Sequence, residues 1–247
     1  MPNRRRLPAS PPGAALYQRE GAPKARVAGA CGALARVFSA AMGRRGAAIT
    51  GAVLGGLAAA LVRERTNPSA CPYSQRWMLH FPRPWLSVER LLEVLEPRAG
   101  ERLLEVGPGT GVQTLPVARA LEPSGTLDAF DVQQEMLDDV ERRAESAGVS
   151  NLRTTLGDGR RLPYGDGSFD GAFLVTVLGE IPDQDAALLE LRRVVRRGGR
   201  VVFGEIPLLD PHFVSASTLV RRASAAGLRF DRRLGPALGF YARFSVP

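Results

Sequence analysis

Residues that commonly build metal and disulfide sites are scarce in this chain. It has two cysteines and two histidines among 247 residues. Cys31 and Cys71 lie far apart and in no metal-ligand spacing, so the sequence predicts free thiols in a reducing compartment and no metal site. A secretory cleavage pattern is also lacking, and we therefore expect a cytoplasmic protein.

Acidic residues are nearly missing from the first 45 residues, which hold nine basic residues and one acidic residue. This segment therefore carries the whole formal net charge of +8, and the rest of the chain is neutral. Residues 1–26 are rich in Pro, Ala, Gly and Arg and show no apolar period. We predict a basic, disordered tail over residues 1–45. The neutral remainder argues against a nucleic acid as partner.

Long apolar runs are absent as well. The longest uncharged stretch, residues 46–62, has 17 residues and is rich in Ala and Gly, which is at the short limit for crossing a bilayer. We expect residues 46–65 to form a helix that lies on a membrane surface, as a peripheral contact, or packs on the domain. A start at Met42 and a cleaved transit peptide both remain open. Residues 66–247 form the main domain, with a lid segment over residues 66–85.

The sequence RLLEVGPGTG at residues 102–111 is the strongest local signal. It predicts a buried strand over 102–106, a glycine-rich turn, and a helix over 112–121, which together open a Rossmann-like nucleotide-binding unit. The dinucleotide fingerprint needs its third glycine where this chain has Val112. The spacing therefore argues against NAD and favours S-adenosylmethionine (SAM). An NAD(P)-binding oxidoreductase and a non-catalytic SAM-binding or membrane-tethered protein remain the alternatives.

Strands and helices are predicted to alternate after this turn, as in an α/β protein with helices on both faces of a mostly parallel sheet. The further strands are expected at 126–130, 152–156, 169–177, 200–205, 228–233 and 238–244. Helices are expected to begin at the Ser87 cap and at Gln134, and to span 183–196 and 215–226. The connection between the last two strands is too short for a crossover helix, so this pair should be antiparallel.

A carboxylate lies at or just after the end of each of the first three predicted strands. SAM has three groups that such side chains could bind, namely a cationic amine, a ribose diol and an adenine. We expect Glu105 to organise the glycine turn around the amino-acid end of SAM, Asp131 to accept from the ribose diol, and Asp158 to accept from the adenine amine. A helix cap for Asp131 and a surface turn for Asp158 are the alternatives. The predicted cofactor-binding residues are Glu105, Gly107, Gly109, Gly111, Asp131, Val132, Asp158, Gly159 and Thr176.

With these motifs, residues 86–244 resemble the class I SAM-dependent methyltransferases. The stretches LLEVGPGTG, DVQQEML, GDGRRLPYGDGSFD and LLELRRVVRRGGRVVFGE look most like the ubiquinone/menaquinone biosynthesis C-methyltransferases and their small-molecule relatives. The resemblance implies a seven-stranded, Rossmann-like sheet with an antiparallel last strand. The quinone enzymes carry an Arg-Asn pair after strand four, whereas this chain reads TVLGE at residues 176–180. That departure puts quinone specificity in doubt.

The acceptor is expected to be a small, fairly apolar, lipophilic molecule that is methylated on carbon or oxygen. The Asn/Asp-Pro-Pro-aromatic signature of amino-group methylation is absent after strand four. We predict an aromatic lid from Trp77, Met78, Phe81 and Trp85, and a rim that includes Leu208, Leu209, Phe213, Phe240 and Tyr241. A base is needed only if the acceptor must lose a proton, and the candidates are Glu180, His80 and Glu205.

Overall fold

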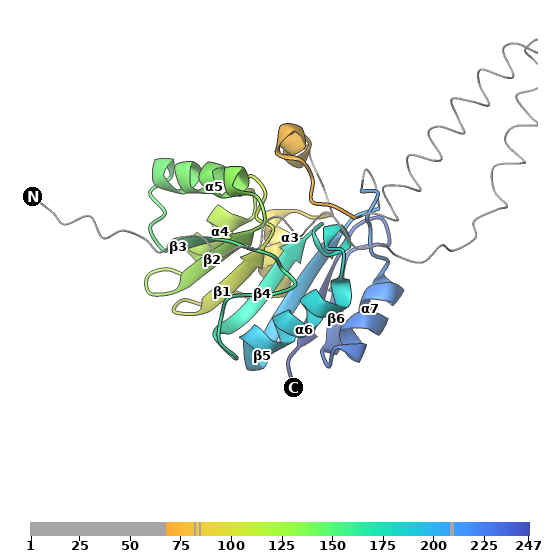
Figure 1. Ribbon diagram of the computed structural model, residues 1–247. Helices are drawn as coiled ribbons and strands as arrows, with labels where there is room; N and C mark the ends of the chain where they lie inside the picture. Colours follow the sequence, from red (N-terminus) through yellow and green to blue (C-terminus); the bar gives the residue numbers. More distant parts are fainter. Residues whose placement is uncertain (1–67, 82, 84, 208–209) are drawn as a thin grey trace, which may run out of the picture.

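The computed structural model describes residues 68–81, 83, 85–207 and 210–247 (Figure 1). The predicted tail over residues 1–45 and the predicted helix over residues 46–65 lie outside this part of the chain, as do Leu208 and Leu209. Among the described residues, no helix combines the length and the apolar character that crossing a membrane requires.

Seven strands form one sheet in the order β3-β2-β1-β4-β5-β7-β6. The strands are β1 (Arg102–Val106), β2 (Thr126–Asp131), β3 (Leu152–Leu156), β4 (Phe169–Val175), β5 (Val195–Glu205), β6 (Arg229–Leu234) and β7 (Phe240–Ser245). The first five strands are parallel, and β7 runs antiparallel to both of its neighbours, β5 and β6. This topology confirms the predicted Rossmann-like fold with an antiparallel last strand.

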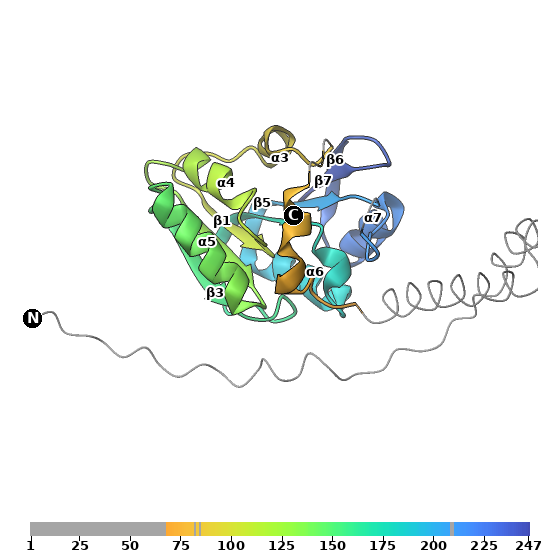
Figure 2. The same cartoon turned by 90° about the horizontal axis from the view of Figure 1, so that it is seen from above.

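Helices cover both faces of the sheet (Figures 1 and 2). One face carries α3 (Val88–Leu95), α4 (Thr114–Ala120) and α5 (Gln134–Ser146), and the other carries α6 (Gln184–Val194) and α7 (Ala216–Ala225). Side chains alternate between the faces along each strand. In β4, for example, Phe173 packs on the α3–α5 side and Leu174 on the α6–α7 side, and both are fully buried. Burial on both faces explains why the central strands read as nearly continuous apolar runs.

Polar side chains at the predicted positions begin three of these helices. The Ser87 hydroxyl accepts from the Arg90 N–H, and the Asp183 carboxylate accepts from the Ala186 N–H at 3.0 Å. Ser215 caps α7 in the same way. Each cap satisfies a backbone donor that the first helical turn would otherwise leave without a partner.

Several element boundaries differ from the predictions by one or more residues, and three of these differences have a clear local cause or consequence. The helix after the glycine turn begins at Thr114 and not at residue 112, because the turn that contains Gly111 continues through Gln113. Strand β4 ends at Val175, because Thr176 has φ +57°. Strand β5 begins at Val195, five residues before the predicted start. Its glycine pair 198–199 lies in a bulge between two registers of the β4–β5 ladder and does not end the preceding helix.

The predicted lid segment contains a 3-10 helix, η2 (Tyr73–His80), which lies across the carboxyl edge of the sheet (Figure 2). The prediction of an aromatic lid is wrong in part. Trp77 is 60% exposed and lines neither the principal pocket nor the cavity beside it, whereas Met78 and Phe81 do line that adjoining cavity. The residues of the lid segment that line the principal pocket are Ala70, Cys71, Leu79 and Arg83.

The predicted aromatic rim is also wrong for two of its members. Phe240 and Tyr241 belong to β7, and both are buried in the core on opposite faces of the sheet. Strand alternation, which the sequence alone could not place relative to the pocket, directs them into the helix layers.

A buried ion pair fixes β5 against the end of α3. The Arg200 guanidinium lies 2.9 Å from a Glu101 oxygen and donates to the Glu96 carbonyl at 2.9 Å, and both charged side chains are largely buried. Arg200→Met would leave Glu101 without its counter-charge. We therefore expect the free energy of unfolding to fall by about 3–5 kcal/mol in denaturant melts.

The matched control for this prediction is Arg222→Met. Arg222 pairs with Asp185 at 3.0 Å on the surface, where Asp185 is well exposed. Loss of this exposed pair should cost less than about 1 kcal/mol. Equal losses in the two variants would contradict the structural role given to Arg200.

Candidate functional site

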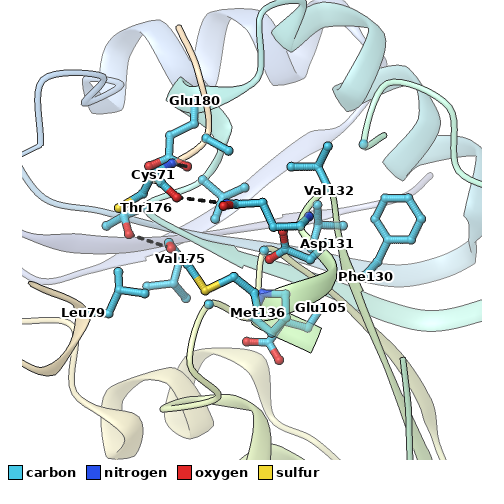
Figure 3. A pocket seen from close by; sticks show the side chains of 18 of the residues that line it. Cys71, Leu79, Glu105, Phe130, Asp131, Val132, Met136, Val175, Thr176 and Glu180 are labelled. Atoms are coloured by element: carbon cyan, nitrogen blue, oxygen red, sulfur yellow. Dashed lines mark hydrogen bonds between the residues drawn. The ribbon is translucent and has the colours of Figure 1, made fainter. Parts of the chain in front are cut away.

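The principal pocket lies at the carboxyl edge of the sheet, where the tips of β1, β2, β3 and β4 meet beneath η2 (Figure 3). Strand order reverses between β1 and β4, and ligands of open α/β sheets bind at such a switch point. The predicted residues that line this pocket are Glu105, Gly107, Gly109, Asp131, Val132, Asp158, Gly159, Thr176 and Glu180.

The glycine turn after β1 requires glycine at two positions for separate reasons. Gly107 and Gly109 both have positive φ, +74° and +53°, which other residues adopt only with strain. Close neighbours also exclude a side chain at each position. A Cβ on Gly107 would lie 2.3 Å from a Val177 methyl carbon, and one on Gly109 would lie 2.8 Å from a Leu79 methyl carbon. Both neighbours line the pocket, so the bare backbone lets the pocket walls close around the turn.

Glu105 is the last charged residue of β1 and is only 3% exposed. Its Oε2 atom is buried and has no hydrogen-bond partner among the described residues. Burial raises the pKa of Glu105 to about 8, the Thr114 hydroxyl partly offsets this, and the negative charge of Asp131 raises it further. Without a cationic ligand, this carboxyl group is therefore mostly protonated at pH 7.

Asp131 ends β2 and holds the turn that follows it. Its Oδ1 accepts from the Gln133 N–H at 2.9 Å. Burial raises the pKa of Asp131 to about 6, and the N–H groups of Gln133, Val132 and Gly109 limit the rise. The N-cap residue of α5 is Gln133 and not Asp131. Asp131 therefore links the β2 tip to the glycine turn while facing the pocket.

Asp158 lies in the turn after β3 and lines the far end of the same pocket. It forms an ion pair with Arg160 at 2.7 Å and accepts from the Arg160 N–H at 2.9 Å. Burial opposes the charged form, but the Arg160 contacts outweigh it and hold the pKa of Asp158 below its usual value. This carboxylate is therefore an ionised acceptor at neutral pH.

The tip of β4 contributes Thr176 and, two residues further on, the short helix η3 (Leu178–Glu180). Thr176 adopts φ +57°, a left-handed conformation that is strained for a residue with a Cβ and that is typical of functional sites. The Glu180 Oε2 accepts from the Cys71 N–H at 3.2 Å. Burial raises the pKa of Glu180 to about 8, although the Cys71 N–H lowers it and the charges of Asp210 and Asp131 raise it.

Three predicted residues do not line this pocket. His80 and Gly111 line a separate open groove beside α4 and α5. Glu205 ends β5, is 1% exposed and accepts from the Val214 N–H at 3.1 Å. The tip of β5 lies one strand further from the switch point than the tip of β4, so Glu205 is displaced from the pocket.

Gln133 is a residue that the sequence analysis missed. Its side-chain amide accepts from the Tyr73 N–H at 3.1 Å and donates to the Cys71 carbonyl at 2.9 Å. The Tyr73 hydroxyl also donates to Asp139 of α5 at 3.0 Å. These bonds tie the start of η2 to the tip of β2, so the lid segment is fastened to the same loop that carries Asp131. The only signal in the sequence was the position of Gln133 within the DVQQEML stretch.

Comparisons with known proteins agree with this geometry. Residues 104–203 match the family model described as a methyltransferase domain. The chain is 41% identical over 115 residues to an uncharacterised 37.1 kDa protein of transposon TN4556 from Streptomyces fradiae, which covers 47% of this chain and 33% of that protein. It is 32% identical over 114 residues to the demethylmenaquinone methyltransferase of Bacillus velezensis, and the match covers 46% of this chain and 49% of that protein. The chain thus spans half or less of the length of these curated relatives.

Among solved structures, a SAM-dependent methyltransferase from Aquifex aeolicus superimposes with a TM-score of 0.66 at 20% identity. The match covers 72% of this chain and 100% of that protein. Residues 104–203 therefore resemble a methyltransferase domain, and the fold is that of the class I, SAM-dependent methyltransferases. Within that class it resembles the quinone methyltransferases, as the sequence predicted.

The residues present fit the cofactor of this class. The buried Glu105 oxygen without a partner fits a ligand that carries a cationic amine. The glycine turn leaves its backbone open to the amino-acid end, Asp131 is an acceptor for a diol, and Asp158 is an ionised acceptor for an exocyclic amine. No cluster that could hold a metal ion occurs in the described part of the chain.

The raised pKa of Glu105 predicts a proton-linked affinity for SAM. A cationic ligand favours the ionised carboxylate, so SAM affinity should rise from pH 6 to pH 8, and binding at pH 7 should release a proton. Calorimetry in two buffers of different ionisation enthalpy measures this release. Glu105→Gln should weaken binding and flatten the pH profile between pH 7 and 8.

Glu105→Gln should also stabilise the ligand-free protein at pH 8. The folded-state pKa of Glu105, about 8, lies above its ordinary value. The contribution of protonated Glu105 to the free energy of unfolding is therefore fully present at low pH and is lost as the pH rises through 8. Glutamine removes this loss. The measurement is the Tm of the wild type and of Glu105→Gln at each pH. A difference in Tm between the two proteins that stays constant from pH 5 to pH 8 would contradict the burial argument.

Proposed function

We propose that this protein transfers a methyl group from SAM to a small, largely apolar acceptor at carbon or oxygen. The observation that carries the proposal is a second cavity that adjoins the principal pocket. The two share six lining residues, which are Ala70, Cys71, Leu79, Arg83, Thr176 and Glu180. A cofactor in one cavity would therefore meet an acceptor in the other at the tip of β4.

The lining of this acceptor cavity supports the class of acceptor. Its walls are mostly apolar, with Pro72 and Met78 from the η2 region and Ile206 and Pro211 after β5. A few polar groups, including Gln75, Asp210 and His212, lie among them. Binding sites for small molecules are typically apolar with a small number of polar groups that fix orientation. Demethylmenaquinone methyltransferase, a relative by sequence, is named for such a lipophilic acceptor.

Methyl transfer of this kind is an in-line displacement at carbon, for which SAM supplies an activated methyl group. The work of the protein is then to align the two reactants and to exclude water. The strand tips fix one reactant, and the η2 segment, held by Gln133 and Glu180, covers the junction of the two cavities. Thr176, whose hydroxyl donates to the Val175 carbonyl (Figure 3), shapes the wall between them.

SAM binding with turnover is the first test. Calorimetry should detect binding of SAM and not of NAD, and Asp131→Ala should weaken SAM binding by about 1–3 kcal/mol, as for a lost charged acceptor. Formation of S-adenosylhomocysteine in the presence of a lipophilic metabolite extract should accompany binding. NAD binding alone would support an oxidoreductase, and SAM binding without turnover would support a non-catalytic SAM-binding protein.

Glu180 is the proposed base for an acceptor that must lose a proton, because it lies at the junction of both cavities and has a pKa of about 8. The rate of methyl transfer should rise with pH as Glu180 ionises. Glu180→Gln should lower kcat by about 10²–10⁴-fold. Glu205→Gln is the matched control, since Glu205 is also a largely buried carboxyl group with a raised pKa but lines neither cavity. A larger loss in Glu205→Gln would reverse the assignment.

A further inference from the structure

Arg83 occupies an unusual position for an arginine. It is the only cationic side chain that lines the cofactor pocket within the described part of the chain, and it also lines the acceptor cavity. The pocket around it is otherwise acidic, with Glu105, Asp131, Asp158 and Glu180 in its lining. Arg83 therefore introduces the one positive charge into an acidic pocket.

The guanidinium of Arg83 has little to bind in the protein itself. It donates to the Leu79 carbonyl at 2.8 Å. No carboxylate of the described residues forms an ion pair with it, and the charge of Asp210 acts on it only at longer range. A guanidinium has five N–H donors, and a half-buried one without an anion is costly. An anionic group of a ligand would satisfy it.

The lid brings Arg83 over the glycine turn. Leu79, whose carbonyl accepts from Arg83, lies so close to Gly109 that a Cβ there would be 2.8 Å from its methyl carbon. The glycine turn is where the amino-acid end of SAM is expected. That end carries an ammonium and a carboxylate. Glu105 suits the ammonium, and the negative charges of Asp131 and Asp158 in the same lining disfavour the carboxylate, which therefore needs a cation.

We propose that Arg83 binds the carboxylate of the amino-acid end of SAM and thereby selects ligands that carry it. The planar fork of arginine suits a carboxylate through two parallel hydrogen bonds. The inference rests on the proposed function, because it requires SAM in this pocket. It adds that the lid segment, and not only the sheet edge, recognises the cofactor.

The test compares ligands with and without the carboxylate by calorimetry. The probes are S-adenosylhomocysteine, SAM and decarboxylated SAM, which keeps the sulfonium and the amine. Wild-type protein should prefer SAM to decarboxylated SAM by about 10- to 100-fold, as for a charged hydrogen bond. Arg83→Met should bind SAM and S-adenosylhomocysteine about 10- to 100-fold more weakly, bind decarboxylated SAM as the wild type does, and so lose the preference.

Arg76→Met is the matched control. Arg76 lies on η2, pairs with Asp139 at 3.5 Å and lines none of these cavities, so the preference for the carboxylate should persist. Arg83→Lys, which keeps the charge but not the fork, should retain part of the preference. An equal loss for all three ligands in Arg83→Met would overturn the inference and indicate a packing role for Arg83.

Two other outcomes separate this inference from the proposed function. If wild type binds SAM and Arg83→Met binds it equally well, but the KM of an anionic acceptor rises in the variant, Arg83 serves the acceptor and the inference fails while methyl transfer stands. If wild type binds none of the three ligands, the proposed function itself fails.

Discussion

Desolvation of carboxylates at one edge of the sheet is the constraint on which the site depends. Parallel strands bring Glu105 and Asp131 to the same edge, and the helices and the lid then exclude water from them. Burial raises the pKa of both groups, and Glu105 stays mostly protonated at pH 7 in the absence of a positive charge. The fold thus keeps carboxyl groups in a pocket where burial disfavours their ionised form. A cationic ligand stabilises that ionised form, and this stabilisation contributes to the free energy of ligand binding.

The two sides of the site differ in how firmly the fold defines them. The cofactor side is built on strand tips and on backbone geometry, including the positive φ values of Gly107 and Gly109. The acceptor side is built from the η2 segment and the loop after β5, which are not part of the sheet. Regular structure therefore builds the proposed cofactor pocket, whereas irregular segments shape the proposed acceptor cavity. The same division explains why a shared fold accommodates different acceptors.

Prediction from the sequence succeeded where regular periodicity carried the signal. Glu105 and Asp131 lie near the ends of β1 and β2, and Asp158 comes two residues after β3, so their place at the sheet edge could be inferred by counting residues. Arg83 and Gln133 could not be found in this way. The η2 helix has no buried residue and thus no apolar period, and the contacts of Gln133 join segments about 60 residues apart. His80 failed as a site residue because it lines only the separate groove beside α4 and α5, whereas its neighbour Leu79 also lines the principal pocket, and local sequence does not reveal this difference.

The position of β7 has a consequence for how the protein is made. Strand β7 is the last strand in the sequence, yet it lies inside the sheet between β5 and β6. During synthesis, β5 and β6 must both leave the ribosome before the strand that joins them. Until residues 240–245 emerge, one edge of β5 and one edge of β6 have unpaired backbone groups. The nascent chain therefore exposes two open strand edges at a late stage, and a single insertion of β7 closes both of them.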